Sequence, residues 1–167
     1  MSAITTLNGV DPAELERTVS AARTDPARAD RRPHLVAEWL GADRSRVRIA
    51  DKALEVNGPG QLGPMQLVLA AFAACEIDVI AMHATLLGVE VEALEIELDA
   101  HFDVRSYLGL DGPPCGLDEA RYVVRLRAPG ITGEQLRRLE EALHRSSPVG
   151  ATLARPVRLA STIELVT

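Results

Sequence analysis

The 167-residue sequence is poor in basic side chains. Its 18 lysines and arginines are outnumbered by 24 aspartates and glutamates, and Lys52 is the only lysine. The formal net charge at pH 7 is -6, and no stretch of arginines outweighs the acidic residues around it. Because nucleic acids and anionic membrane surfaces attract positively charged patches, we expect neither as a partner.

The chain also lacks an uninterrupted apolar run of the roughly 18 to 20 residues that a membrane-spanning helix needs. Its first residues, MSAITTLNGVDPAELER, contain no basic segment followed by an apolar one, as a secretory signal would. We therefore expect a cytoplasmic protein without a membrane partner. Its length, with 47% hydrophobic and 25% charged residues, is typical of one globular domain. We divide residues 1–167 into an N-terminal helix with its connector (1–33) and a core (34–167).

Cysteines are few, and metal-ligand spacings are missing. Cys75 and Cys115 lie on segments of different character, so a disulfide framework is not indicated and reduced thiols are expected. The four histidines are isolated from one another and from the cysteines, so we expect neither a metal site nor a cofactor. The segment NGPGQLGP lacks the lysine of a phosphate-binding loop, and no serine-nucleophile motif occurs.

Changes in hydrophobic period divide the first half of the chain into elements. Asp11 followed by Pro12 is typical of a helix start, which predicts a helix from Pro12 to about Arg23. The short runs HLVAEWL, RVRIA and ALEV then predict a small first sheet. After NGPGQLGP, a long helix is predicted from near Pro64 to Gly88, since proline suits the first position of a helix and glycine suits its end.

The second half alternates with a period of two. In VEALEIELDAHFDV, apolar residues alternate with acidic ones, which predicts a half-buried strand, and EARYVVRLRA alternates in the same way. Antiparallel pairing of these strands would set a row of arginines beside a row of carboxylates. ITGEQLRRLEEALHRS predicts a second helix and PVRLASTIELV predicts a closing strand. The predicted fold class is α+β.

Cys75 lies on the most apolar face of the long predicted helix. That face is formed by Val68, Phe72, Cys75, Val79, Met82 and Leu86. Position alone favours a packing role, because loss of water disfavours the thiolate of a buried cysteine, and Cys75 lies too far from the helix start to be activated by the helix dipole. Glu76 and His83 on the same helix are too far apart for a direct hydrogen bond, and we interpret them as a polar or interfacial stripe.

The opening of this helix and one later tripeptide carry a family resemblance. The sequence GPMQLVLAAFAACE, an amphipathic strand, a helix ending in Ser147-Pro148-Val149 and a closing strand follow one another. This order resembles the OsmC/Ohr family of organic-hydroperoxide-handling proteins over roughly residues 39–165, and FDVRSYLGL resembles the OsmC-like branch that has an N-terminal helix. The resemblance implies antiparallel sheets around a long central helix, in an intertwined homodimer.

The resemblance also implies a reaction. In active members of the family, a cysteine at the position of Cys75 attacks a peroxide to give a sulfenic acid and an alcohol, and a second cysteine then forms a disulfide with it. That second position holds Ser147, which cannot form a disulfide, and a glutamate of the active members is replaced by Met65. The thiolate-stabilising arginine comes from the N-terminal sheet, where Arg44 and Arg46 are the better candidates.

Two functions from different classes remain open. The first is a one-cysteine thiol peroxidase that reduces hydrophobic organic hydroperoxides through Cys75, with a low-molecular-weight or protein thiol as external resolver. The second is a non-catalytic OsmC-fold dimer that binds a small hydrophobic ligand, with Cys75 as a structural or sensor thiol. Retention of Cys75 favours the first, whereas Ser147 and Met65 favour the second. Cys115, in the loop GLDGPPCGLDE, could replace the missing resolving cysteine, although a lone loop cysteine is usually incidental.

Overall fold

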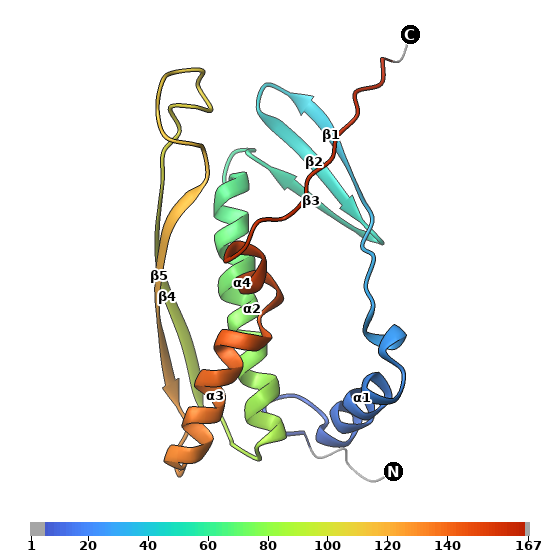
Figure 1. Ribbon diagram of the computed structural model, residues 1–167, viewed down its shortest axis with the longest axis vertical. Coiled ribbons are helices and arrows are strands. Elements are labelled where there is room, and N and C mark those ends of the chain that lie inside the picture. Colours follow the sequence, from blue (N-terminus) through green and yellow to red (C-terminus); the bar gives the residue numbers. More distant parts are fainter. Residues whose placement is uncertain (1–5, 166–167) are drawn as a thin grey trace.

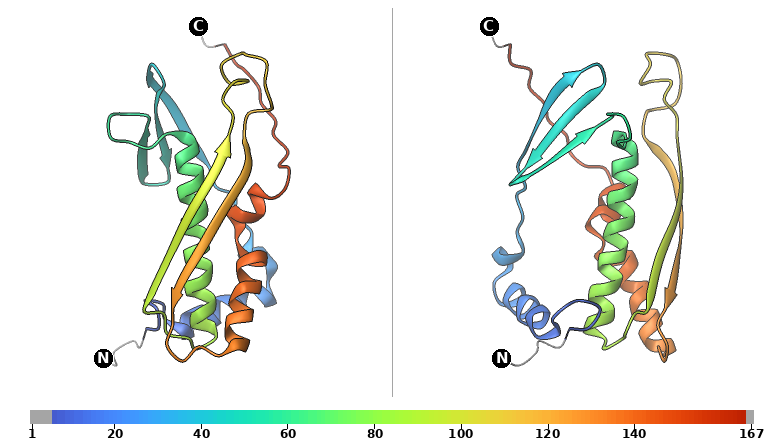
Figure 2. Two further views of the ribbon diagram at one scale, coloured as in Figure 1. Left: turned by 90° about the vertical axis from the view of Figure 1, so that its left-hand side faces the viewer. Right: turned by 180° about the vertical axis from the view of Figure 1, so that it is seen from behind.

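The computed structural model describes residues 6–165 as a long central helix with an antiparallel sheet on either side (Figures 1 and 2). The first sheet has the order β1-β2-β3, and the second consists of β4 and β5. The strands are β1 (Leu35–Gly41), β2 (Arg44–Ile49), β3 (Lys52–Val56), β4 (Ala93–Phe102) and β5 (Leu117–Arg127). The helices are α1 (Pro12–Thr24), the 3-10 turn η1 (Pro26–Ala29), α2 (Pro64–Leu86), α3 (Gly133–Ser146) and α4 (Pro148–Leu153). The α+β class and the long central helix are as predicted.

Local caps set the helix ends. Asp11 Oδ1 accepts a hydrogen bond from Ala13 N at 2.9 Å at the start of α1, as expected for an aspartate N-cap. After α2, Gly88 adopts φ 67°, a left-handed conformation that glycine reaches without steric cost. At α3, Thr132 Oγ1 accepts from Gln135 N while the Gln135 side chain accepts from Thr132 N, so both backbone donors are satisfied.

Asn8 joins the N-terminal segment to the end of α2. Its Nδ2 donates to Thr85 Oγ1 at 3.1 Å and to Val89 O at 2.9 Å, and its Oδ1 accepts from Val91 N at 2.8 Å. These bonds satisfy backbone groups of the turn after α2, which intrahelical bonds leave unpaired. One asparagine thereby holds α1 beside the C-terminal end of α2 (Figure 1).

The hairpin of β4 and β5 carries the predicted rows of charge on its outer face. The register sets Glu95 opposite Arg125 and Asp99 opposite Arg121. The Arg125 guanidinium contacts Glu95 Oε1 at 3.0 Å and also reaches the Glu97 carboxylate. These ion pairs match opposite charges across the two strands. Because their side chains are solvent-exposed, the pairs add little stability.

The buried face of α2 differs from the predicted stripe. Phe72 and Val79 are buried as expected, but Leu86 is 41% exposed and Cys75 is only half-buried. The side covered by α3, α4 and β4 lies one residue further round the helix. Its buried residues are Phe72, Glu76, Val79, Ile80, Ala84 and Thr85. The stripe was therefore misplaced, because the packing of later elements decides which side of an apolar helix is covered.

The predicted closing strand does not form within this chain. Residues 156–165 are extended but make no ladder hydrogen bonds with any other part of residues 6–165, and they run away from α4 as a lone segment (Figures 1 and 2). Leu159 and Ile163 are each 90% exposed. An alternating segment becomes a strand only beside a free sheet edge, and among residues 6–165 no sheet edge pairs with it.

By length and composition, α2 could cross a bilayer, although it contains no long uninterrupted apolar run. Core helices of soluble proteins meet the same criterion. In this structure α2 contacts α1, α3, α4 and β4, and it carries a fully buried glutamate, Glu76. These contacts are those of a central packing helix.

Candidate functional site around Cys75

Cys75 and Ser147 lie side by side where α2 meets the junction of α3 and α4. The Ser147 hydroxyl lies 3.4 Å from Cys75 Sγ and donates a hydrogen bond to it. Ser147 ends α3 and caps α4, and its Oγ accepts from Gly150 N at 2.9 Å. Because a hydroxyl that accepts from an N–H keeps its own proton free, this proton can be directed at the sulfur. The two positions singled out in the sequence are thus in contact.

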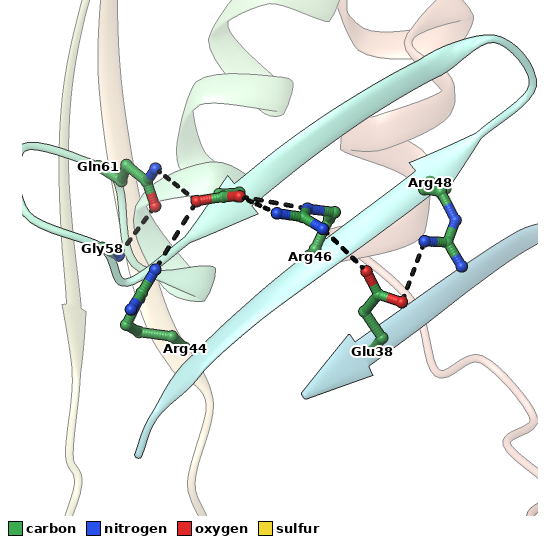
Figure 3. Close-up of polar contacts among 7 residues, drawn as sticks. Glu38, Arg44, Arg46, Arg48, Gly58 and Gln61 are labelled. Carbon is green, nitrogen blue, oxygen red and sulfur yellow. Dashed lines mark hydrogen bonds and ion pairs between the residues drawn. The ribbon is translucent and has the colours of Figure 1, made fainter. Parts of the chain in front are cut away.

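Arg44 and Arg46 lie on β2 within a network of ion pairs (Figure 3). Arg46 Nη2 lies 2.6 Å from Glu55 Oε1, and its Nη1 lies 3.3 Å from Glu38 Oε1. Arg44 makes one looser contact, 3.9 Å from Glu55 Oε2. Hydrogen bonding to Arg46 lowers the pKa of Glu55. Among the described residues, no contact joins either guanidinium to Cys75, so their catalytic role stays a prediction.

Cys115 is exposed on the loop between β4 and β5, and both cysteines are free thiols. This loop extends beyond the N-terminal end of α2 (Figure 1), whereas Cys75 lies roughly 16 Å along α2 from Pro64 at 1.5 Å per residue. The structure therefore does not bring the two thiols together within one chain.

Glu76, which the sequence led us to interpret as part of a polar or interfacial stripe, is instead buried at this site. It is 1% exposed, and its Oε2 has no hydrogen-bond partner among residues 6–165. A Cβ at Gly150 would lie 3.0 Å from Glu76 Oε1 and 2.9 Å from Ser147 Oγ, so the glycine leaves room for both side chains. The signal was present, because Glu76 is four residues after Phe72 and three before Val79, on the same helical face.

A cavity of about 320 Å³ adjoins Glu76. The Phe72 and Tyr122 rings pack edge to face with centroids 5.1 Å apart. Burial raises the pKa of Tyr122, and the nearby Glu76 carboxylate raises it further, so this phenol stays a neutral donor. The lining residues are Phe72, Glu76, Ala120, Tyr122, Leu143, His144, Ser147, Gly150, Ala151, Leu153 and Ala154. Ser147 thus belongs both to the cavity wall and to the contact with Cys75.

The histidines do not form a metal centre. Within residues 6–165, no three His, Cys, Asp or Glu side chains gather as ligands. His101 Nδ1 instead lies 2.8 Å from Asp118 Oδ1 on the exposed hairpin, and this hydrogen bond lowers the pKa of Asp118. His83 lines an open hollow against α3, and burial lowers its pKa.

The model of the OsmC-like protein family matches residues 57–162, which include Cys75, Glu76 and Ser147. This chain belongs to the OsmC-like family. A comparison with curated proteins found no match.

Solved structures of OsmC-like proteins share the fold. An OsmC-like protein from Mycoplasma pneumoniae superimposes with a TM-score of 0.61 at 16% identity, covering 75% of this chain and 89% of that one. An organic hydroperoxide resistance protein OsmC from Legionella pneumophila gives 0.51 at 17% identity, covering 74% and 89%. An OsmC-like hydroperoxide resistance protein from a Jannaschia species gives 0.50 at 20% identity, covering 77% and 89%. The predicted OsmC/Ohr-like fold is confirmed.

Proposed function

We propose that this OsmC-like protein is a cytoplasmic one-cysteine thiol peroxidase that reduces organic hydroperoxides through Cys75. The observation that carries the proposal is the hydrogen bond from Ser147 Oγ to Cys75 Sγ. A donor directed at the sulfur stabilises the thiolate, which is the nucleophilic form of cysteine. The names of the Legionella and Jannaschia proteins as hydroperoxide resistance proteins support the same class of substrate.

The reaction requires a thiol from outside the chain. The Cys75 thiolate attacks one peroxide oxygen, the O–O bond breaks, and the leaving alkoxide takes up a proton to become an alcohol, while Cys75 becomes a sulfenic acid. Ser147 has no sulfur with which to form a disulfide. A low-molecular-weight or protein thiol therefore attacks the sulfenic sulfur, releases water and leaves a mixed disulfide, which a second thiol reduces.

The exposed surface of the single chain supports a homodimer. A compact monomer of 18.0 kDa exposes about 8,000 Å², whereas this chain exposes 13074 Å². Large apolar side chains contribute to the excess, including Trp39 at 76% exposure and Leu165 at 94%. In the proposed homodimer, a sheet edge of the second chain pairs with residues 156–165.

The same dimer would bring an arginine to the thiolate. Arg46 is held by Glu55 and Glu38, so moving it would break two ion pairs. Arg44 keeps only one contact at 3.9 Å and is 44% exposed. We therefore favour Arg44 of the second chain as the cation that stabilises the Cys75 thiolate.

Trapping of the sulfenic acid tests the proposal. Reduced protein is treated with cumene hydroperoxide or tert-butyl hydroperoxide in the presence of dimedone and digested, and the peptides are analysed by mass spectrometry. We expect an adduct on Cys75 that is lost in Cys75→Ala and retained in Cys115→Ser. An unmodified Cys75 under excess peroxide would reject the peroxidase.

The alternative is a non-catalytic dimer that binds a small hydrophobic ligand. The observation that favours it is the largely apolar cavity beside Ser147, lined by Phe72, Leu143 and Leu153 among others. On this alternative Cys75 serves in packing or as a sensor. Turnover of peroxide with excess external thiol separates the two, because a sensor reacts with peroxide but does not consume it continuously.

A further inference from the structure

We infer that the cavity beside Glu76 binds a small organic ammonium ion that carries an apolar body. The cavity shares Ser147 with the proposed peroxide site, but binding of an ammonium ion by Glu76 does not rest on the peroxide chemistry. Glu76 would bind the ammonium group at the buried end of the cavity, and the apolar lining of α2, β5, α3 and α4 would enclose the rest of the ligand.

The unpartnered oxygen of Glu76 indicates a missing hydrogen-bond donor. Buried polar atoms in folded proteins are almost always hydrogen-bonded, since leaving one unpaired costs free energy. Glu76 Oε2 is buried without a partner in the described part of the chain. No lysine or arginine is among the residues that line the cavity, and His144 is its only basic side chain. The hydroxyls of Tyr122 and Ser147 also line the cavity, but neither donates to Glu76 Oε2, so a donor from outside the chain would satisfy this oxygen.

The charge and shape of the cavity narrow the ligand class. A carboxylate attracts a cation more strongly than a neutral donor through a charge-assisted hydrogen bond, and it repels an anion. The rings of Phe72 and Tyr122 can add cation–π attraction beside it. A volume of about 320 Å³ lies at the lower end of the range of roughly 300 to 1,000 Å³ that small-molecule sites span. A compact amine fits these conditions.

Gly150 keeps the carboxyl group accessible from the cavity. A side chain at this position would press against both Glu76 and Ser147, because even a Cβ would come within 3.0 Å of each. Gly150 has no other conformational need to be glycine, since its φ lies outside the left-handed region. Its small size therefore preserves the space around Glu76 Oε1.

Calorimetric titration of the reduced full-length protein with three matched probes tests the site. The probes are 2-phenylethylammonium, neutral 2-phenylethanol and anionic 3-phenylpropionate. We expect the ammonium probe to bind at least tenfold more tightly than either of the others. Glu76→Gln should weaken its binding at least tenfold, whereas Glu90→Gln, an exposed control on the loop after α2, should leave it unchanged.

A second variant separates loss of the site from loss of the fold. Ala151→Leu fills the cavity from α4 and leaves Glu76 in place, so it should also abolish binding. Equal binding of the three probes, no binding of the ammonium probe to the unaltered protein, or insensitivity to both variants would overturn the inference. The inference would also be overturned if no ammonium probe bound and Glu76→Gln dissociated a dimer. That result would show that the carboxyl group contacts the second chain and not a ligand. Because no peroxide is present, a negative result leaves the dimedone experiment unaffected.

Discussion

The hydroxyl of Ser147 lies 3.4 Å from Cys75 Sγ and is oriented by the N–H of Gly150. The family resemblance assigns this position to the second cysteine of active members, and under the proposed function Ser147 offers Cys75 a proton in place of a sulfur. Its hydroxyl donates to the Cys75 sulfur and also accepts from the backbone at the start of α4.

Ser147→Ala should slow oxidation of Cys75 by cumene hydroperoxide roughly tenfold to a hundredfold, because a hydrogen bond to a charged group contributes about 1.5 to 3 kcal/mol. Loss of the cap should also lower the free energy of unfolding by about 1 kcal/mol. Dimedone trapping over time measures the first effect and chemical denaturation the second. Ser146→Ala, at the exposed neighbouring position, is the control, and equal oxidation rates in the two variants would exclude the proposed hydroxyl role.

Ser147→Cys should restore an internal disulfide. The oxygen-to-sulfur distance of 3.4 Å places the new thiol within reach of Cys75, given a small rotation of the side chain. After one equivalent of peroxide, mass spectrometry without reduction should show the introduced thiol bonded to Cys75, and dithiols should then become effective reductants. The matched variant Ser146→Cys should form no such bond. A sulfenic acid that persists in Ser147→Cys would contradict the placement.

Arg44 and Arg46 should respond differently to the same change. Arg44→Gln should slow oxidation of Cys75, whereas Arg46→Gln should chiefly disturb the sheet. Hydrogen bonding to Arg46 lowers the pKa of Glu55, so that interaction stabilises the fold above the ordinary carboxyl pKa and is lost as pH falls through the lowered value. In Arg46→Gln, the NMR titration of Glu55 should move up towards its ordinary range. An unchanged titration of Glu55 would contradict the structural role of Arg46. Slower oxidation of Cys75 in Arg46→Gln than in Arg44→Gln would assign the thiolate-stabilising role to Arg46 instead.

His83 should make the protein less stable in mild acid. Burial lowers its pKa, so below about pH 6.5 the unfolded chain binds a proton that the folded chain binds less readily. Stability therefore falls as pH drops from about 6.5 towards the folded pKa. The charged groups that share its hollow are Arg138, Glu141 and Arg145.

His83→Gln should reduce the drop in melting temperature between pH 7.5 and pH 5.5, as measured by circular dichroism. His34→Gln, at an exposed position, should leave that drop unchanged. If both variants show the same pH dependence as the unaltered protein, His83 is not its source.

The predictable parts of the fold depend on local physics. Asp11 and Gly88 mark helix ends because capping involves only neighbouring backbone groups. In β4 and β5, the alternation of apolar and charged residues indicates that one face of the hairpin is covered. Glu76 shares its helical face with Phe72 and Val79, but its burial was not predicted because the helices that cover it follow much later in the chain. The contact between Cys75 and Ser147 spans 72 positions, and only the family resemblance, not the residue pattern, pointed to it.

The predicted closing strand, which is not formed within a single chain, leads to a test of the homodimer. In a lone chain, Leu159 and Ile163 are each 90% exposed, and charged substitutions there would change stability by no more than about 0.5 kcal/mol. If residues 156–165 instead form a strand against a second chain, Leu159→Asp and Ile163→Asp bury an unpaired carboxylate in the interface. We expect each to shift the protein from dimer to monomer in light scattering after size exclusion. Thr162→Asp adds the same charge on the other side of the alternating segment and should perturb the dimer less. If all three variants remain dimeric, residues 156–165 do not form a strand against the second chain.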